Sequence, residues 1–243
     1  MATCVRAATV MSSDPRLELL TRGTITIKGR MPWSSNVTLL AELALEGRVG
    51  LAVYKPGRGE RPLWDFPPAL YKREIAAYHL SEALGWDLVP LTVPREGPLG
   101  EGSLQLFVQA DFEQHYLTLL EREEHRAQLQ RICLFDLLAN NADRKSGHCL
   151  LGADGRIYAI DNGLTFHVEP KLRTVIWDFA GEPIPPELLA AVGRLLDAGI
   201  PDALAELLSA DERRVLGSRG KALARAKRFP KDASGARYPW PLV

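Results

Sequence analysis

The positions of apolar and polar residues divide the chain near residue 110. Before this point five runs have the length and alternation of strands: residues 23–28, 36–45, 48–54, 89–93 and 103–109. The second and third runs are separated by Glu46-Gly47, a turn sequence. We therefore expect an antiparallel sheet in this half of the chain.

One main helix is expected within the sheet-rich half, over residues 72–84. Its apolar residues Ile75, Tyr78 and Leu84, together with several alanines, recur at steps of three and four residues. This spacing places them on one buried face of a helix. Gly85 is a typical residue to end such a helix.

After residue 110 the pattern becomes mostly helical. Helices are expected over residues 123–138, 185–198, 201–208 and 211–229. Between the first and second of these, Asp154-Gly155 is the turn signal of a short hairpin. The second and third helices are opened by proline, which is favoured at an early helical position.

These patterns give four expected segments. Residues 1–20 are a flexible leader, in which Ser13 or Asp14 is a candidate cap for a short helix. Residues 21–110 form an N-lobe with the sheet and the main helix, and residues 111–229 form a helical C-lobe. Residues 230–243 are an irregular tail.

Composition restricts the partners that the protein can have. The 243 residues include 30 Lys and Arg against 30 Asp and Glu, and zero net charge gives no general attraction to nucleic acid. No apolar run approaches the roughly 20 residues needed to span a bilayer, and no signal peptide is indicated. Three cysteines without metal-ligand spacing fit a reducing environment, so we expect a cytoplasmic protein.

Two aspartates in the second half suggest phosphoryl transfer. Asp143 lies in the loop sequence of residues 140–145 (Asn-Asn-Ala-Asp-Arg-Lys), and Asp161 follows eighteen positions later after an apolar run. One carboxylate can orient or deprotonate an attacking hydroxyl while the other holds a divalent metal on the nucleotide phosphates. Taken alone, each aspartate is also an ordinary turn residue.

A lysine and a glutamate upstream favour the same chemistry. Lys55 ends the strand-like run 48–54, and Glu74 lies nineteen residues later in the predicted helix. A strand lysine paired with a helix glutamate keeps its ammonium group directed at phosphate oxygens. Singly, Lys55 is also explained as a strand end and Glu74 as a solvated helix residue. Their order along the chain, ahead of the two aspartates, favours a kinase-type site.

Short strings of residues resemble a known family. They lie at 32–36 (Pro-Trp-Ser-Ser-Asn), 53–56 (Val-Tyr-Lys-Pro), 59–67 (Gly-Glu-Arg-Pro-Leu-Trp-Asp-Phe-Pro) and 140–145. The chain resembles a bacterial family of distant relatives of the phosphatidylinositol 3- and 4-kinases, in a clan that also includes HipA-type kinases. The resemblance covers most of residues 20–200. It implies an α+β, two-lobed protein-kinase-like fold, with an antiparallel-sheet N-lobe carrying one main helix and a mostly helical C-lobe.

The resemblance also implies roles for the four ionisable residues. Lys55, with Glu74 as its partner, would contact the α- and β-phosphates of ATP. Asp143 matches the catalytic-loop aspartate. Asp161 matches the aspartate that holds Mg²⁺ or Mn²⁺.

Three further residues take roles from the same resemblance, and two more take a role from kinase-type chemistry. Ser34 and Ser35, between the first two strands, would cover the phosphates. Val108, at the end of the fifth strand, would lie in the hinge beside the adenine. Arg144 or Lys145 would offset negative charge that develops during transfer.

His148 departs from the family pattern. The fifth residue after the catalytic-loop aspartate is usually a metal-binding Asn, and here it is His148. Mg²⁺ prefers oxygen ligands, whereas imidazole suits softer ions such as Mn²⁺. Three interpretations stay open: His148 is a ligand of Mn²⁺ in a metal-binding site, it binds phosphate when protonated, or it marks a site that has lost catalysis.

Two other features have alternative interpretations. Trp64 and Phe66 lie in a proline-rich loop and either cover the site or anchor the loop in the core. Residues 211–231 contain eight basic residues against two acidic ones, which is typical of a solvated helix face but would also suit an acidic partner or anionic lipid headgroups.

The predicted function is an ATP-dependent phosphotransferase that transfers the γ-phosphate to a hydroxyl acceptor, which is a lipid, a protein or a metabolite. Two alternatives use the same fold. One is a nucleotide-binding pseudokinase acting as a regulatory or scaffold module, and the other is a nucleotidyl transferase. The oligomeric state does not follow from the sequence.

Overall fold

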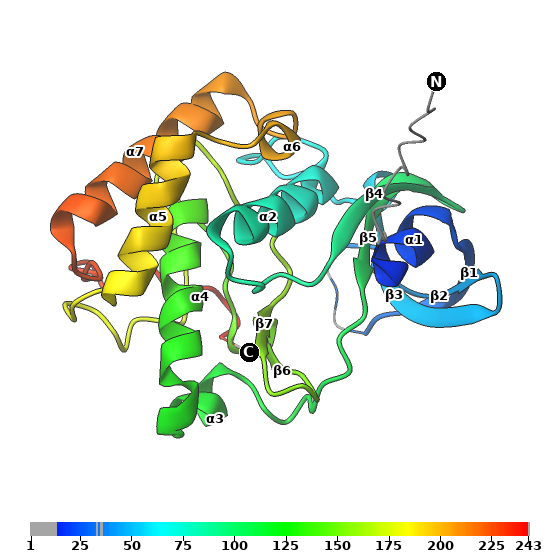
Figure 1. Ribbon diagram of the computed structural model, residues 1–243, viewed down its shortest axis with the longest axis horizontal. Coiled ribbons are helices and arrows are strands. Elements are labelled where there is room, and N and C mark those ends of the chain that lie inside the picture. The colour runs from blue at the N-terminus through cyan, green and yellow to red at the C-terminus, as the bar shows by residue number, and fades with distance from the viewer. Residues whose placement is uncertain (1–13, 33, 35, 243) are drawn as a thin grey trace, which may run out of the picture.

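A computed structural model describes residues 14–242 of the chain except 33 and 35. These residues form two lobes side by side, with the large sheet in one and most of the helices in the other (Figure 1). The predicted α+β, two-lobed architecture is confirmed. Residues 1–13, which are most of the predicted leader, lie outside the described residues.

The first lobe is a five-stranded antiparallel sheet with the order β1-β2-β3-β5-β4. Its strands are β1 Thr24–Arg30, β2 Leu39–Leu45, β3 Arg48–Pro56, β4 Thr92–Gly97 and β5 Gly100–Leu106. In β2, the buried Leu39, Ala41 and Leu43 alternate with less buried residues, as expected for a sheet with one face on a core. Glu46 and Gly47 both have positive φ, which suits the two-residue hairpin turn between β2 and β3.

A short helix, α1 (Pro15–Arg22), packs on this sheet. The Asp14 carboxylate accepts a hydrogen bond from the backbone N–H of Arg16 at 2.9 Å, which caps the helix as predicted. Leu19 and Leu20 are buried in the core of the sheet lobe. The prediction that the leader extends to residue 20 is therefore wrong, because these two leucines give the segment an apolar face to bury.

The predicted strand at residues 89–93 begins only at Thr92. The Ser81 hydroxyl accepts hydrogen bonds from the backbone N–H groups of Leu88 and Val89, at 2.8 and 3.3 Å. These two donors are satisfied by a helix side chain, so they are not available to a neighbouring strand. This contact depends on tertiary packing and has no signal in the local pattern.

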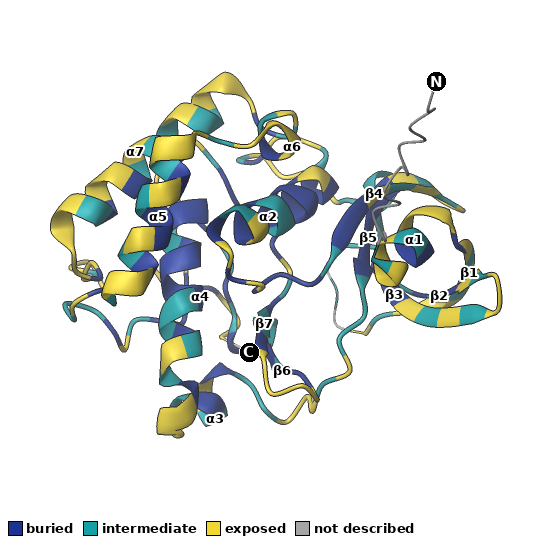
Figure 2. Ribbon diagram, viewed as in Figure 1, coloured by how far each residue is buried: buried dark blue, intermediate teal, exposed yellow. Residues whose placement is uncertain are grey.

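The second lobe is built from helices around one large apolar core. Its helices are α3 Tyr116–Leu120, α4 Arg126–Ala139, α5 Pro186–Ala198, α6 Asp202–Ala205 and α7 Ala210–Ala226. Most of α4 is buried, whereas α5 and α7 each expose one side (Figure 2). No helix in the described part of the chain is long and apolar enough to cross a bilayer.

Two smaller predictions about this lobe are confirmed. The hairpin after α4 consists of β6 (Cys149–Leu151) and β7 (Ile157–Ala159), and Gly155 at its turn has a φ of 77°. The tail has no helix or strand between residues 230 and 242. The carbonyl of Leu242 accepts a hydrogen bond from the backbone N–H of Ser146 at 2.8 Å, so the tail lies against the loop after α4.

The helix α2 (Leu70–Leu84) lies between the two lobes (Figure 1). It contacts β4 and β5 on one side and α5 and α6 on the other. Its Ala76, Leu80 and Leu84 belong to the core of the helical lobe, and Gly85 ends it in the left-handed conformation, as predicted. The helical lobe therefore fixes the position of α2, and the sheet closes against it.

The N-terminus of α2 is capped from a distance. The residue before the helix, Ala69, has no side-chain acceptor. Instead, Glu60 in the loop after β3 accepts hydrogen bonds from the backbone N–H groups of Leu70 and Tyr71, at 2.9 and 2.7 Å. A carboxylate here satisfies two free N–H groups and lies at the positive end of the helix dipole.

Replacing Glu60 with alanine should lower the free energy of unfolding by about 1–2 kcal/mol, because that is the usual cost of losing an N-terminal cap. Glu60→Gln keeps an acceptor oxygen and should lose less. Urea denaturation followed by circular dichroism measures both. A Glu60→Ala protein as stable as the wild type would show that this contact does not stabilise α2.

Candidate active site

Three ionisable side chains from three different elements meet between the lobes. Lys55 comes from β3, Glu74 from α2, and Asp161 from the segment after β7. The ammonium group of Lys55 donates hydrogen bonds to Oε1 of Glu74 and, at 2.8 Å, to Oδ1 of Asp161. The fold thus brings together residues that are up to 106 positions apart.

Burial and opposite charge act against each other in this cluster. Burial lowers the pKa of Lys55, but Asp161 and Glu74 more than offset it and raise that pKa above its ordinary value. Lys55 in turn holds the pKa of Asp161 far below its usual range, while burial raises the pKa of Glu74. The Glu74 side chain is only 3% exposed and that of Asp161 is 51% exposed. Asp161 is therefore the carboxylate that an incoming ligand can reach.

Asn162 fixes the backbone beside Asp161. Its N–H donates to Oε2 of Glu74 at 2.9 Å, and its side chain donates to the carbonyl of Ala159 at 3.0 Å. Its Oδ1 accepts a hydrogen bond from Arg144 at 2.7 Å. With its amide used in this way, Asn162 positions Asp161.

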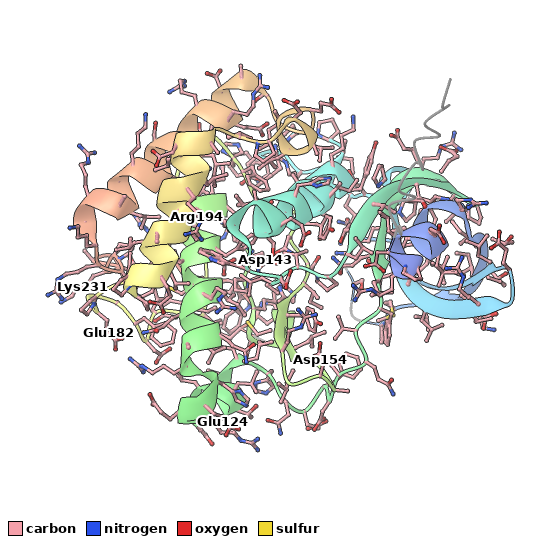
Figure 3. All side chains as sticks on the ribbon, viewed as in Figure 1. Glu124, Asp143, Asp154, Glu182, Arg194 and Lys231 are labelled. Atoms are coloured by element: carbon pink, nitrogen blue, oxygen red, sulfur yellow. The ribbon has the colours of Figure 1, made fainter. Side chains whose placement is uncertain are left out.

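Asp143 lies in a tight loop after α4. Asn140 ends the helix in the left-handed conformation, and Oδ1 of Asn141 accepts a hydrogen bond from the backbone N–H of Asp143 at 2.9 Å. Figure 3 labels Asp143 below α2 in this view, and its side chain is 26% exposed. Burial raises the pKa of Asp143, and this is opposed by the Lys145 ammonium group, 2.7 Å from its Oδ2.

The sequence suggests that Arg144 offsets charge at the transferred phosphate, but the structure places it elsewhere. Its side chain is fully buried, and its guanidinium group contacts Oδ1 and Oδ2 of Asp136 at 2.9–3.2 Å. It also donates to the carbonyl of Ile160 at 2.6 Å. Arg144 therefore connects the loop of Asp143 to the segment of Asp161 and is not free to contact a phosphate. Of the two predicted cations, Lys145 is the one beside Asp143.

Asp136, the partner of Arg144, was not identified from the sequence. It lies on α4 among core residues, and its side chain is 1% exposed. Asn141 donates a further hydrogen bond to its Oδ1 at 3.1 Å. The available signal was a carboxylate on an otherwise apolar helix face, eight residues before an arginine.

His148 lies next to Asp161. Its Nε2 is 3.4 Å from Oδ2 of Asp161, and its Nδ1 is 3.1 Å from the carbonyl oxygen of Asp143. Burial lowers the pKa of His148 to about 4, so the ring is neutral near pH 7. Phosphate binding by a protonated ring is therefore disfavoured. Nδ1 also lies 3.3 Å from the backbone N–H of Lys145, which donates to it in the tautomer with hydrogen on Nε2. In the other tautomer Nδ1–H donates to the Asp143 carbonyl, and Nε2 presents its lone pair, as in metal-binding histidines.

Asp161 and His148 fit a divalent ion that arrives with a nucleotide. In the described part of the chain, no three His, Cys, Asp or Glu side chains cluster into a complete metal site. Nucleotide enzymes commonly hold Mg²⁺ with one or two carboxylates while the phosphates supply other ligands. One exposed carboxylate and one neutral imidazole agree with that pattern.

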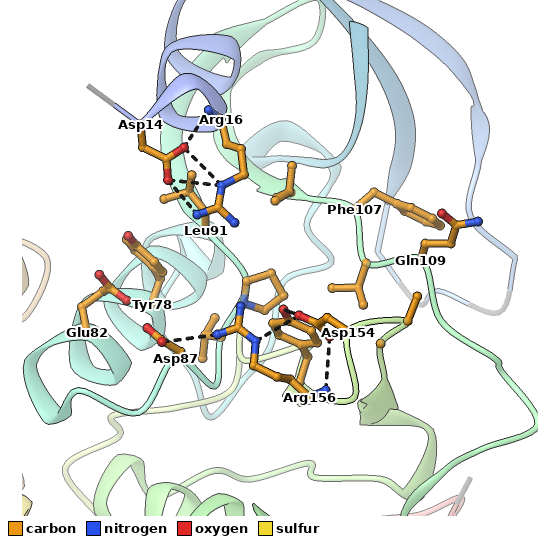
Figure 4. A pocket seen from close by; sticks show the side chains of 17 residues that line it. Asp14, Arg16, Tyr78, Glu82, Asp87, Leu91, Phe107, Gln109, Asp154 and Arg156 are labelled. Atoms are coloured by element: carbon orange, nitrogen blue, oxygen red, sulfur yellow. Dashed lines mark hydrogen bonds and ion pairs between the residues drawn. The ribbon is translucent and has the colours of Figure 1, made fainter. Parts of the chain in front are cut away.

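Of the three other residues predicted to contact the nucleotide, the structure describes Ser34 and Val108. Ser34 lies in the connection from β1 to β2, and Ser35 lies outside the described residues. Val108 follows β5 and lines a cavity of about 440 Å³, together with Tyr78 of α2 and Gly152 of the hairpin (Figure 4). This cavity has none of the four ionisable site residues in its lining.

The two arginines in this cavity are paired with carboxylates. Arg16 lies 2.7 Å from Asp14, and Arg156 contacts Asp154 and Asp87 at 3.0 and 3.3 Å (Figure 4). Because carboxylates already neutralise both arginines, the cavity is poorly suited to a triphosphate. The cluster around Lys55 remains the better candidate for the chemistry.

The two aromatic residues of the proline-rich loop behave differently. Phe66 is buried against Leu70 and Ala142, so for this residue the interpretation as a core anchor is confirmed. Because Ala142 directly precedes Asp143, the anchor also contacts the loop of Asp143. Trp64 is 94% exposed, and the Lys171 ammonium group lies 5.6 Å from the centroid of its ring.

The basic segment at residues 211–231 has structural contacts. Nε of Arg219 donates to the carbonyl of Leu138 at 2.8 Å, near the end of α4. Arg228 donates to the carbonyl of Gly181 at 2.7 Å. Other basic residues lie on the exposed side of α7, which agrees with a solvated helix face (Figure 2).

The chain is similar in sequence to a mycobacterial protein. No protein-family model matches the chain. The chain is 39% identical over 275 aligned positions to "Protein Rv2133c" of Mycobacterium tuberculosis, and the alignment covers 98% of this chain and 99% of that protein.

Two solved structures are similar to the fold. One is the crystal structure of the Helicobacter pylori proinflammatory kinase CtkA, with a TM-score of 0.52 and 15% identity, covering 86% of this chain and 94% of that one. The other is hydra Fam20 with sugar, with a TM-score of 0.56 and 15% identity, covering 89% and 91%. At this identity the likeness concerns the fold, and the predicted kinase-like fold is confirmed. The relationship to phosphatidylinositol kinases and HipA-type kinases stays a prediction.

Arg144→Met should destabilise the protein by about 3 kcal/mol or more, because it leaves Asp136 buried without its charged partner. Adding Asp136→Leu should restore part of the loss. Arg225→Met, on the exposed side of α7, is the matched control and should change stability by less than about 0.5 kcal/mol. Denaturant unfolding measures all three, and an Arg144→Met protein of unchanged stability would contradict a positioning role.

Proposed function

The chain belongs to the family of Mycobacterium tuberculosis Rv2133c, and we propose that it is an ATP-dependent phosphotransferase with a kinase-type site. The observation that carries the proposal is the convergence of Lys55, Glu74 and Asp161 between the lobes. A lysine held by a helix glutamate beside a metal-binding aspartate is the arrangement that kinases use for a triphosphate. The kinase-like fold supports the same conclusion at a coarser level.

In this proposal Lys55 binds the α- and β-phosphates of ATP. Its ammonium group is charged and oriented by the buried Glu74, so it needs little rearrangement when phosphate oxygens arrive. Ser34 and Ser35 contribute to the cover over the phosphates, and Val108 lies beside the adenine. Mg²⁺ or Mn²⁺, held by Asp161 and His148, would neutralise charge on the phosphate oxygens.

Asp143 acts on the acceptor. As the acceptor oxygen forms its bond to the γ-phosphorus, the bond from that phosphorus to the β–γ bridging oxygen breaks and ADP leaves. Asp143 orients the acceptor hydroxyl and takes its proton. A carboxylate whose pKa is raised by burial is better matched to proton transfer than an exposed one. Lys145, in contact with Asp143, offsets the negative charge that develops nearby.

A second candidate function is a nucleotide-binding pseudokinase that acts as a regulatory or scaffold module. The observation that favours it is His148 at a position where the resembled family has a metal-binding Asn. A protein that binds ATP with a divalent ion, but transfers neither its γ- nor its α-phosphate, would be this second candidate. Transfer of label from the α-phosphate instead would identify a nucleotidyl transferase.

Asp143→Asn should keep ATP binding and lose most of the turnover, by a factor of about 10² or more, because general-base catalysis typically contributes that much. Binding is measured by thermal shift with ATP and Mn²⁺, and turnover by release or transfer of γ-labelled phosphate. Asp197→Asn, at an exposed position on α5, serves as the control and should behave as the wild type. Unchanged turnover in Asp143→Asn would remove this residue from the mechanism.

His148→Asn should raise turnover with Mg²⁺ relative to Mn²⁺, because an amide oxygen replaces an imidazole nitrogen in the metal-binding position. The ratio of the two rates in one protein preparation is the readout, so a change in folded fraction does not affect it. A ratio equal to that of the wild type would show that His148 does not contact the metal.

A further inference from the structure

Arg173 is fixed to the loop of Asp143 at three points. Its backbone N–H donates to the carbonyl of Asn141 at 2.9 Å, and its carbonyl accepts the N–H of Arg144 at 3.0 Å. Its Nε donates to the carbonyl of Ala142 at 2.8 Å. These contacts hold the guanidinium group against the residue that directly precedes Asp143.

Four cationic residues contact the segment 140–145 or belong to it, and three of them have a carboxylate partner. The pairs are Arg144 with Asp136 at 2.9 Å, Lys145 with Asp143 at 2.7 Å, and Lys171 with Asp65 at 3.2 Å. Among the residues that the structure describes, Arg173 is paired with no carboxylate, and it is exposed. Its charge is therefore balanced by solvent or by a ligand.

The charge of Arg173 acts on the acceptor half of the site. The positive charge of Arg173 lowers the pKa of Asp143, although burial and Lys145 have larger effects on that pKa. The pKa of Asp161 is governed mainly by Lys55. Arg173 is hydrogen-bonded to residues on both sides of Asp143, so it lies with the group that would orient the acceptor hydroxyl. Lys55 lies instead with Asp161, on the nucleotide side of the site.

We propose that Arg173 binds an anionic group, a phosphate or a carboxylate, of the acceptor whose hydroxyl Asp143 orients. The proposal rests on the proposed function and adds the class of acceptor to it: an anionic hydroxyl compound. With Nε fixed by a carbonyl, both Nη atoms stay available for a two-pronged contact with an oxyanion. The planar guanidinium group would set the distance between that anion and the hydroxyl, so Arg173 determines specificity rather than performing proton transfer.

Inorganic phosphate and acetate are the probes, titrated separately into ¹⁵N-labelled protein saturated with a non-hydrolysable ATP analogue and Mg²⁺. The Nε–H signal of Arg173, assigned by its absence in Arg173→Lys, reports binding in the wild type by NMR, and the backbone N–H signal of residue 173 reports it in the wild type and in every variant. We expect a saturable shift, with the tighter of the two anions identifying the preferred group. Arg173→Met should weaken binding by about tenfold or more, since a hydrogen-bonded charged contact contributes that much. Arg173→Lys should retain part of it.

Arg225→Met is the matched control, an exposed arginine outside the site, and should bind the anions as the wild type does. Binding of neither anion to the wild type, or equal binding by Arg173→Met, would overturn the proposal. If the ATP analogue itself does not bind, the proposed function fails. The same titration of the nucleotide-free wild type and of nucleotide-free Arg173→Met then still tests Arg173, because the two proteins differ only in that cation.

Discussion

The ammonium group of Lys55, shared between Glu74 and Asp161, is the interaction on which the proposed site depends. It joins the sheet of the first lobe to α2 and to the segment after β7. Because the core of the helical lobe holds α2, Lys55 reaches Glu74 only when the sheet is closed against that helix. One charged group therefore couples the arrangement of the lobes to the geometry of the site.

A second ion pair, between Arg144 and Asp136, joins the loop of Asp143 to the segment of Asp161. Arg144 is buried with Asp136 and also reaches Ile160 and Asn162. A buried ion pair is weak evidence for stability in itself, because desolvation offsets most of the attraction. Its role here is positional, since one guanidinium group sets the distance between the loop of Asp143 and the segment of Asp161. Arg144, which the sequence suggests as a cation for catalysis, thus positions the segments that carry Asp143 and Asp161.

Much of the fold could be predicted because its signals are local. The alternation in β2, the Glu46-Gly47 turn and the apolar face of α2 depend on residues a few positions apart. Lys55, Glu74, Asp143 and Asp161 could be proposed because kinase chemistry requires these residue types in this order. Three features could not be predicted: the burial of Arg144, the exposure of Arg173 and the start of β4 at Thr92. Each depends on whether a distant segment supplies a partner. In sequence, Arg144 and Arg173 look alike, and only the position of Asp136 separates them.

A crystal of the protein soaked with a non-hydrolysable ATP analogue and Mn²⁺ tests the central claim most directly, through the anomalous signal of manganese. The account predicts a peak in contact with Asp161, with the phosphates within hydrogen-bonding distance of the Lys55 ammonium group. A nucleotide whose phosphates lie instead in the cavity beside Tyr78 and Arg156, with Lys55 still held by both carboxylates, would contradict it.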